Sequence, residues 1–216
     1  MTTEFQRARS TEAKQQREQA ILDAAAALGA ERGIRQVTLT DIAEVVGMHK
    51  SALLRYFETR EQIFLRLTAT GWRDWAPALR AGLAQLSEPT PAAVAAVFAE
   101  TLTARPMFCD LLAQAPLNLE RNVSLDSVLA FKLVTLEEVT LISAELRRLL
   151  PHLDEGDTID IVAAATSMAG AFWQMATPGP KIEQLYRSDP RLSHAVVDVR
   201  PRLACILTAQ LTGLAS

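Results

Sequence analysis

The sequence has few of the residues that stabilise secreted domains or hold metal ions. Its 216 residues include two cysteines, Cys109 and Cys205, which are widely separated and lack the spacing of a metal site. Disulfide-rich domains need several cysteines, and zinc sites need them in close groups. We therefore expect two reduced, packed thiols in a cytoplasmic protein, without a metal ion or any other cofactor.

The motifs of common enzyme classes are missing as well. The chain has no Gly-x-Ser-x-Gly elbow, no glycine-rich phosphate loop and no His-Glu-x-x-His. Its three histidines, His49, His152 and His194, are isolated in the sequence. We interpret the carboxylates at 137–138 and 154–157 as solvated helix faces and a loop, so that no enzymatic activity is expected.

Long hydrophobic runs are limited to one stretch. Residues 1–10 are polar and charged, unlike a signal peptide. Residues 161–180 carry no charge, but they include Thr, Ser and Gln and end in Pro-Gly-Pro. This stretch predicts a buried helix and not a membrane span, so no membrane partner is expected.

Glycine and aromatic residues are scarce, whereas alanine and leucine are abundant. Nine glycines, 6 % aromatic residues and 49 % hydrophobic residues favour an all-α fold with one sizeable core, or a small domain joined to a larger one. The net charge of −3 is uneven: residues 1–72 hold ten Lys and Arg against nine Asp and Glu, and the remainder twelve against sixteen. Because DNA binding depends on the local field, this balance is compatible with an N-terminal DNA-binding domain.

Residues 38–57 have the pattern of two short helices separated by one glycine. Thr38 is a good N-cap, and Asp41 follows where a carboxylate favours the amides of the first turn. The apolar spacing after Thr38 predicts a helix of about two turns, which Gly47 ends by taking a left-handed conformation. A second helix from about His49 turns Leu53 inward and leaves polar and basic residues on its open face. Such a helix is suited to the major groove.

The wider pattern is Thr-x-x-x-Ile-Ala-x-x-x-Gly, an apolar residue, four others, then Leu-x-x-Tyr-Phe-x-(Ser/Thr)-(Lys/Arg)-Glu, here Thr38 to Glu61. It resembles the DNA-binding domain of the TetR family of transcriptional regulators, over residues 12–67. The resemblance implies a flexible N-terminal arm at 1–10, a three-helix helix-turn-helix domain at 11–58 and a connecting helix at 59–77. A helical effector-binding and dimerisation domain would occupy 78–216.

The resemblance also implies contacts with double-stranded DNA before, on and after the second helix. The implied residues are Thr38, Thr40, His49, Lys50, Ser51, Ala52, Arg55, Tyr56 and Arg60. The threonines and Tyr56 would meet phosphates, while the second helix would read base edges, where Lys50 and Arg55 favour guanine. His49 replaces a common serine of the family, and a role as a surface residue or helix cap stays open. Arg60 begins the next helix, where a cation opposes the dipole, so we interpret it as serving DNA.

Prolines divide the rest of the chain into helices, which we predict near 78–87, 91–104, 106–114, 122–149, 157–175 and 201–214. Pro77 is expected to kink the connecting helix or to begin a new segment. Several large residues are candidates to line a cavity for an unidentified small apolar effector, although each would serve equally as core packing. These candidates are Trp72, Trp75, Phe98, Met107, Phe108, Phe131, Phe172, Trp173 and Met175.

The last two long helices predict a homodimer. Apolar residues at helical spacing and small residues that allow close approach suggest a four-helix bundle formed by two chains, although both stripes would equally cover the body's own core. The predicted interface residues are Ile159, Val162, Ala163, Ser167, Gly170, Leu203, Ile206, Leu207, Gln210, Leu211 and Leu214. Two-fold symmetry then predicts a palindromic operator.

The pattern as a whole favours a sequence-specific DNA-binding regulator, a repressor released from its palindromic operator by a small apolar ligand. Two alternatives stay open at this point. One is a helical ligand-binding protein or enzyme that kept the fold without the DNA role. The other is a TetR-like activator.

Overall fold

The structure, a computed structural model, describes the backbone of residues 2–215 and the side chains of residues 12–215. Within that part every regular element is a helix, as the composition predicts. The α-helices are α1 (Thr2–Arg32), α2 (Leu39–Val45), α3 (Lys50–Leu53), α4 (Arg60–Ala84), α5 (Pro91–Thr103), α6 (Pro106–Gln114), α7 (Leu125–Leu149), α8 (Glu155–Ala176), α9 (Pro180–Ser188) and α10 (Val199–Leu214). Short 3-10 helices η1 (Ile34–Gln36), η2 (Leu119–Asn122) and η3 (Pro190–Ala195) lie between them.

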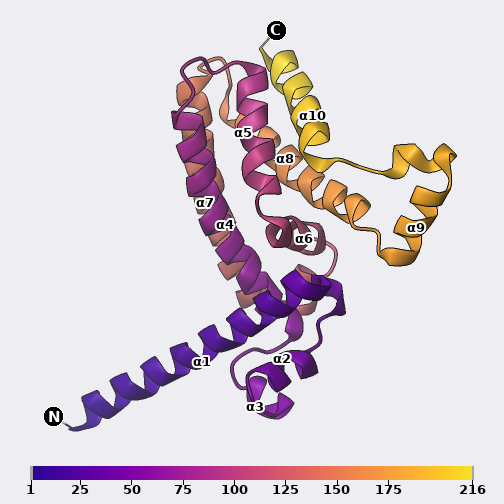
Figure 1. Ribbon diagram of the computed structural model, residues 1–216. Helices are drawn as coiled ribbons and strands as arrows, with labels where there is room; N and C mark the ends of the chain where they lie inside the picture. Colours follow the sequence, from indigo (N-terminus) through magenta and orange to yellow (C-terminus); the bar gives the residue numbers. More distant parts are fainter. Residues whose placement is uncertain (1, 216) are drawn as a thin grey trace.

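The chain forms a small N-terminal head and a larger body. The head consists of α1, η1, α2 and α3, the body of α5 to α10, and α4 joins the two (Figure 1). Buried apolar residues of the head, such as Ile21 and Leu53, belong to the same continuous core cluster as those of the body. The head is therefore packed on the body and not tethered to it by a loose linker.

The N-terminal arm is a correction to the sequence-based prediction. We expected a flexible arm at 1–10 and the helix-turn-helix domain to begin at residue 11, but α1 is helical from Thr2. Residues 2–28 contain neither glycine nor proline and are rich in Ala, Gln, Glu and Arg, which are good helix formers, so nothing in the sequence stops the helix. Figure 1 shows this end of α1 extending away from the rest of the molecule.

The connecting helix is a second correction. We expected Pro77 to kink the helix or to begin a new segment, with a separate helix near 78–87. Helix α4 instead continues from Arg60 to Ala84 with Pro77 inside it, so the prediction of a separate helix is wrong. A proline within a helix costs a hydrogen bond and clashes with the preceding turn. Trp75 before it and Leu79 after it are both fully buried, so packing on the two sides holds the helix together.

The body is arranged around α4. Helix α7 packs along α4, α6 packs on α8, and α10 covers α5 and α8 (Figure 1). The predicted body helices near 91–104, 106–114, 122–149, 157–175 and 201–214 correspond to α5, α6, α7, α8 and α10. Two elements, α9 and η3, were not expected from the sequence, and they project from the body between α8 and α10. Helix α9 has no buried residue.

Neither a membrane span nor a metal cluster stands out among the described residues. No single helix there is both long and apolar enough to cross a membrane, while α5 and α6 meet that requirement only as a pair, bent by 90°. No three His, Cys, Asp or Glu side chains among these residues are grouped so that they could hold a metal ion.

Candidate nucleic-acid interface

Both ends of α2 have the geometry that the sequence predicts. The Thr38 hydroxyl accepts the backbone N–H of Asp41 (3.2 Å), and an oxygen of the Asp41 carboxylate accepts the backbone N–H of Thr38 (2.7 Å). The Thr38 hydroxyl also donates to the Asp41 carboxylate (2.7 Å). This hydrogen bond, and then the one from the Thr38 backbone N–H, lower the pKa of Asp41 below its ordinary value. Gly47, with φ of 66°, takes the left-handed conformation that ends α2. Because the Thr38 hydroxyl is engaged as the cap, a phosphate would have to share it.

Helix α3 lies at the end of the head that is remote from the body (Figure 1). Leu53 on its inner side is fully buried. Lys50, Ser51 and Arg55 are exposed, and no ion pair holds Lys50 or Arg55 among the residues whose side chains are described. Lys50 and Ser51 of α3, and Arg55 just after it, therefore offer two cations and a hydroxyl to the surroundings.

The remaining predicted contact residues differ in exposure. Thr40 on α2 and His49 at the N-cap of α3 are exposed, and His49 makes no side-chain capping bond. Ala52 and Tyr56 are half-buried. The contacts of these positions with DNA stay a prediction.

Arg60 departs from the sequence-based interpretation. Its guanidinium donates hydrogen bonds to the backbone carbonyls of Ile34 and Val37 and forms an ion pair with Glu61 (3.0 Å). It also lies over the ring of Phe64, at 4.7 Å from the centroid. With its donors engaged in this way, Arg60 joins η1 to α4 inside the head. The two carbonyls lie 23 and 26 residues away in the sequence, so the position of Arg60 at the start of a helix does not indicate them.

A carboxylate just after the head binds the start of α7. One oxygen of Glu58 accepts the backbone N–H of Ser124 (2.8 Å) and the hydroxyls of Ser124 and Ser127 (both 2.9 Å). These hydrogen bonds, the backbone one first, lower the pKa of Glu58 below its ordinary value. Sequence reasoning missed this contact, because its partners are 66 and 69 residues away. The sequence does indicate Ser124 as an N-cap, and the N-terminus of a helix attracts an anion.

A second carboxylate joins the head to the opposite side of the body. Asp110 on α6 is 8 % exposed; its Oδ2 accepts the backbone N–H of Ile34 (2.9 Å) and its Oδ1 accepts the side-chain amide of Gln174 on α8 (2.8 Å). One buried carboxylate therefore links the head to two body helices. In the sequence, the only indication of this contact is a single aspartate in an otherwise apolar helix.

The aromatic residues proposed for an effector cavity mostly pack on each other. Trp72 and Trp75 are 5.3 Å apart between ring centroids, and Phe108 lies 5.8 Å from Trp72 and 5.9 Å from Trp75. Phe98, 6.2 Å from Trp75, completes the cluster, and all four rings are buried. These four residues pack on one another in the core, which favours the core-packing alternative for them.

The other effector candidates lie elsewhere. Phe131 lines a cavity of about 480 Å³ between α4 and α7, and Met107 and Trp173 line one of about 570 Å³ at the junction of head and body. Phe172 is half-buried, and Met175 is exposed. Met175 also lines a smaller cavity of about 100 Å³ near α9. Four of the nine predicted residues thus border a cavity, but in three different places.

The predicted dimer residues divide into two groups. Val162, Gly170, Leu203, Leu207 and Leu211 are buried within the chain, which favours for them the alternative that the stripes cover the body's own core. A Cβ on Gly170 would lie 2.8 Å from an α6 backbone nitrogen, which shows that this small residue serves the α6–α8 contact.

The second group remains accessible on α8 and α10. Its exposed members are Ile159, Ala163, Ser167 and Ile206, while Gln210 and Leu214 are half-buried.

Comparison with known families covers both halves of the chain. Residues 21–67 match the profile of the bacterial regulatory proteins of the tetR family, and residues 69–216 match that of a tetracyclin repressor-like C-terminal domain. The junction of the two profiles falls inside α4, which therefore contributes to both domains. No curated protein matches the chain significantly.

Solved structures share the fold at low sequence identity. The TetR family transcriptional regulator PfmR from Thermus thermophilus is 16 % identical, with 89 % of this chain and 97 % of that chain covered and a TM-score of 0.55. FadR from Bacillus subtilis, solved in complex with stearoyl-CoA, is 16 % identical, with 92 % and 97 % covered and a TM-score of 0.55. RolR, solved with the ligand resorcinol, is 19 % identical, with 92 % and 96 % covered and a TM-score of 0.52.

The two profiles and the helix-turn-helix geometry agree, and the longer profile alone spans more than half of the chain. The chain belongs to the TetR family of transcriptional regulators, which combine a helix-turn-helix DNA-binding domain with a ligand-binding C-terminal domain.

Proposed function

We propose that this regulator is a homodimeric repressor that binds a palindromic operator and is released from it by a small molecule. The observation that carries the DNA role is the exposure of Lys50 and Ser51 on α3 and of Arg55 just after it, while Leu53 of the same helix is fully buried. Two such helices, related by a two-fold axis and separated by about one turn of DNA (~34 Å), read two half-sites in successive major grooves.

The proposed dimer face is the accessible side of α8 and α10, two helices that pack on each other. Ala163 and Ser167 allow close approach of a second chain, and Ile159 and Ile206 supply apolar area. A competing face exists on α7, where four leucines at helical spacing are between 56 and 86 % exposed: Leu125, Leu129, Leu133 and Leu136.

Size-exclusion chromatography with light scattering separates the two faces. We expect Ala163→Glu or Ile206→Glu to produce monomers and Leu129→Glu to leave the dimer intact. Dimers that persist with both substitutions on α8 and α10 but dissociate with Leu129→Glu would assign the interface to α7 instead.

The release step requires a ligand that distinguishes two conformations of the protein. A ligand that binds both conformations equally, however tightly, shifts nothing. Helix α4 enters the head at Arg60 and the body core at Leu83, so a change of its tilt alters the separation of the two heads. The bound stearoyl-CoA of FadR and the bound resorcinol of RolR illustrate two ligands of very different size on this fold.

The proposal is tested by a selection of genomic fragments with the purified protein, followed by a salt series on the best fragment. We expect one palindromic site, with the logarithm of affinity falling linearly with the logarithm of salt, by roughly 0.9 per phosphate neutralised. Repression is tested by transcription from the recovered promoter with and without the protein. Sequence-blind binding alone would contradict the specific-regulator role, and transcription that rises with the protein would show an activator.

A further inference from the structure

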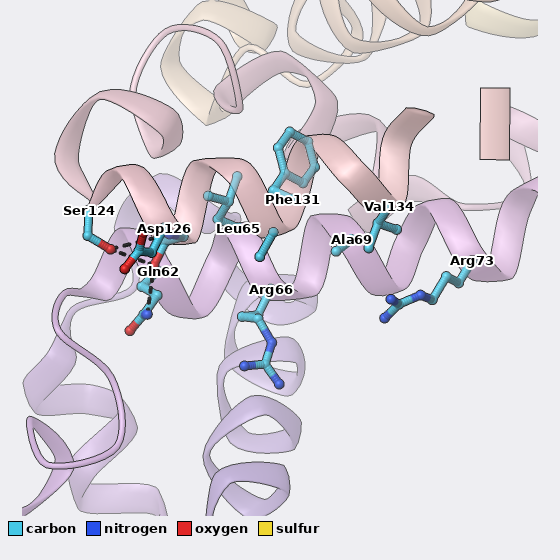
Figure 2. A pocket seen from close by; sticks show the side chains of 11 residues that line it. Gln62, Leu65, Arg66, Ala69, Arg73, Ser124, Asp126, Phe131 and Val134 are labelled. Carbon is cyan, nitrogen blue, oxygen red and sulfur yellow. Dashed lines mark hydrogen bonds between the residues drawn. The ribbon is translucent and has the colours of Figure 1, made fainter. Parts of the chain in front are cut away.

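We propose that the cavity between α4 and α7 is the effector site and that it takes a small amphipathic anion, an apolar chain ending in a carboxylate or phosphate. This inference rests on the proposed function, in which a ligand controls DNA binding. Figure 2 shows the cavity along the two helices, with α7 carrying Phe131 and Val134, Ser124 just before it, and α4 carrying Arg66 and Arg73.

The volume and the apolar lining of the cavity suit a small molecule. Its volume is about 480 Å³, within the range of known ligand pockets. Leu65 and Ala69 of α4 face it together with Ala130, Phe131 and Val134 of α7. Such a lining accommodates an apolar chain, in agreement with the apolar effector that the sequence predicts.

The charged side chains of the cavity are what specify an anion. Arg66 and Arg73 are two turns apart on α4, so they lie on the same side of that helix. Both are exposed and line the cavity, and neither has an ion-pair partner among the residues with described side chains. By contrast, Arg60 and Arg105 are paired with Glu61 and Asp74.

One carboxylate, Asp126, also lines the cavity. A second carboxylate, Glu58, lies beside the serines of the cavity and is already engaged by three hydrogen bonds. The two unpaired guanidinium groups are therefore the groups left to bind a ligand, and a guanidinium binds carboxylate and phosphate through paired hydrogen bonds.

The polar end of the cavity is also the contact between the head and α7. Ser124, Ser127 and Gln62 line it, and the two serines are the residues that hold Glu58. Gln62 in turn donates to the Ser127 hydroxyl (2.9 Å) and accepts the Glu58 backbone N–H (2.7 Å). An anion at this end competes with the Glu58 carboxylate for the same hydroxyls and repels it. Binding of the ligand therefore weakens an anchor of the head, which couples this site to DNA affinity.

Isothermal titration calorimetry with matched ligands tests the site without DNA. The probes are decanoate and decyl phosphate, with decanol and decyltrimethylammonium as the neutral and cationic controls, all below their micelle concentrations. We expect both anions to bind, decanol to bind about tenfold more weakly, and the cation not to bind, because each charge-assisted hydrogen bond is worth a tenfold change or more. Equal binding of decanol and decanoate would overturn the assignment of an anion.

Variants locate the binding. Arg66→Gln with Arg73→Gln should weaken decanoate about tenfold or more, while Arg147→Gln, an exposed arginine further along α7, should leave it unchanged. Ala130→Trp, at an exposed position that lines the cavity, should block both anions by filling the space. Unchanged binding in both cavity variants would place the ligand elsewhere and refute the site.

The coupling is read from operator affinity with and without decanoate. The wild-type protein should lose operator affinity on adding decanoate, and Glu58→Gln should reduce that loss, because it removes the charge that the ligand repels. An equal loss in Glu58→Gln would refute this coupling. Failure of decanoate to bind a protein that still selects an operator overturns only the site. Decanoate binding by a protein that selects no operator overturns the regulator role and leaves the site intact.

Discussion

Replacement of Asp110 by alanine is the most informative test of how the head is held. The Asp110 carboxylate accepts the N–H of Ile34, which is buried, and the amide of Gln174, which is half-buried. Loss of a hydrogen bond to a charged group costs roughly 1.5–3 kcal/mol, mainly because the buried donor is left without a partner. The Gln174 amide regains water and adds less, and the buried carboxylate no longer has to be desolvated, which offsets part of the loss. We expect Asp110→Ala to lower the free energy of unfolding by about 2–3 kcal/mol.

The assay is urea unfolding at a fixed protein concentration, followed by the fluorescence of the tryptophans, two of which are buried in the core. The midpoint should fall without a change in the slope m. Asp74→Ala is the matched control, since Asp74 also binds another helix, through Arg105 (2.7 Å), but its side chain is 67 % exposed. An exposed ion pair is worth about 0–1 kcal/mol. A loss in Asp110→Ala no larger than that of Asp74→Ala would refute the reasoning that burial decides the contribution.

Further predictions concern single positions. Thr38→Ala removes the cap of α2 and should cost about 1 kcal/mol in the same urea assay; Thr38→Ser, which keeps the hydroxyl, should cost less, and equal losses would contradict the capping role. Gly170→Ala places a Cβ 2.8 Å from the α6 backbone and should cost about 1–3 kcal/mol of unfolding free energy through overpacking, so a neutral result would mean that α6 and α8 separate easily. Native thiol labelling should modify Cys205, which is exposed, and not Cys109, because burial and then the Asp110 charge raise the pKa of the Cys109 thiol to about 12; labelling of both thiols at equal rates would contradict this. Glu58 should stabilise the folded protein fully above its ordinary pKa of 4.5, and this stabilisation should be lost as the pH falls through its lower folded-state pKa. In an acid unfolding titration the Glu58→Gln variant should lack that step. Identical unfolding curves for the variant and the wild type would contradict the assignment.

Much of the head could be predicted because its signals are local. The cap at Thr38, the left-handed Gly47 and the buried Leu53 lie within sixteen residues, and each acts on its immediate neighbours. The all-α fold and the membership of the TetR family were predicted from the composition and from this stretch, and they are confirmed by the structure and the family profiles.

The contacts that join the head to the body could not be predicted, because their partners are distant in the sequence. Arg60 has the charge of a DNA contact, but carbonyls more than twenty residues away decide its orientation. Glu58 and Asp110 appear as isolated carboxylates until the fold brings Ser124 and Ile34 to them.

Helical periodicity also leaves the packing partner open. The stripe of α10 that contains Leu203, Leu207 and Leu211 predicts a buried face correctly, but the same spacing suits a partner chain or the chain's own α5. Gly170 marks a close helix contact correctly, yet the neighbouring helix is α6 and not a second copy. Aromatic residues present the same ambiguity between a cavity wall and a filled core, and only the arrangement of the rings resolves it.

The most direct test of the DNA-binding role is fluorescence anisotropy on the selected operator. It compares the wild-type protein with a double variant that carries both Lys50→Ala and Arg55→Ala. The control double variant, Arg147→Ala with Lys181→Ala, makes the same change of charge at exposed positions outside the head. We expect the α3 variant to lose at least about a hundredfold in affinity, because each base contact is worth roughly 1–3 kcal/mol, and the control to bind like the wild type. Equal affinity of both variants for the operator would contradict the role of α3 in reading DNA.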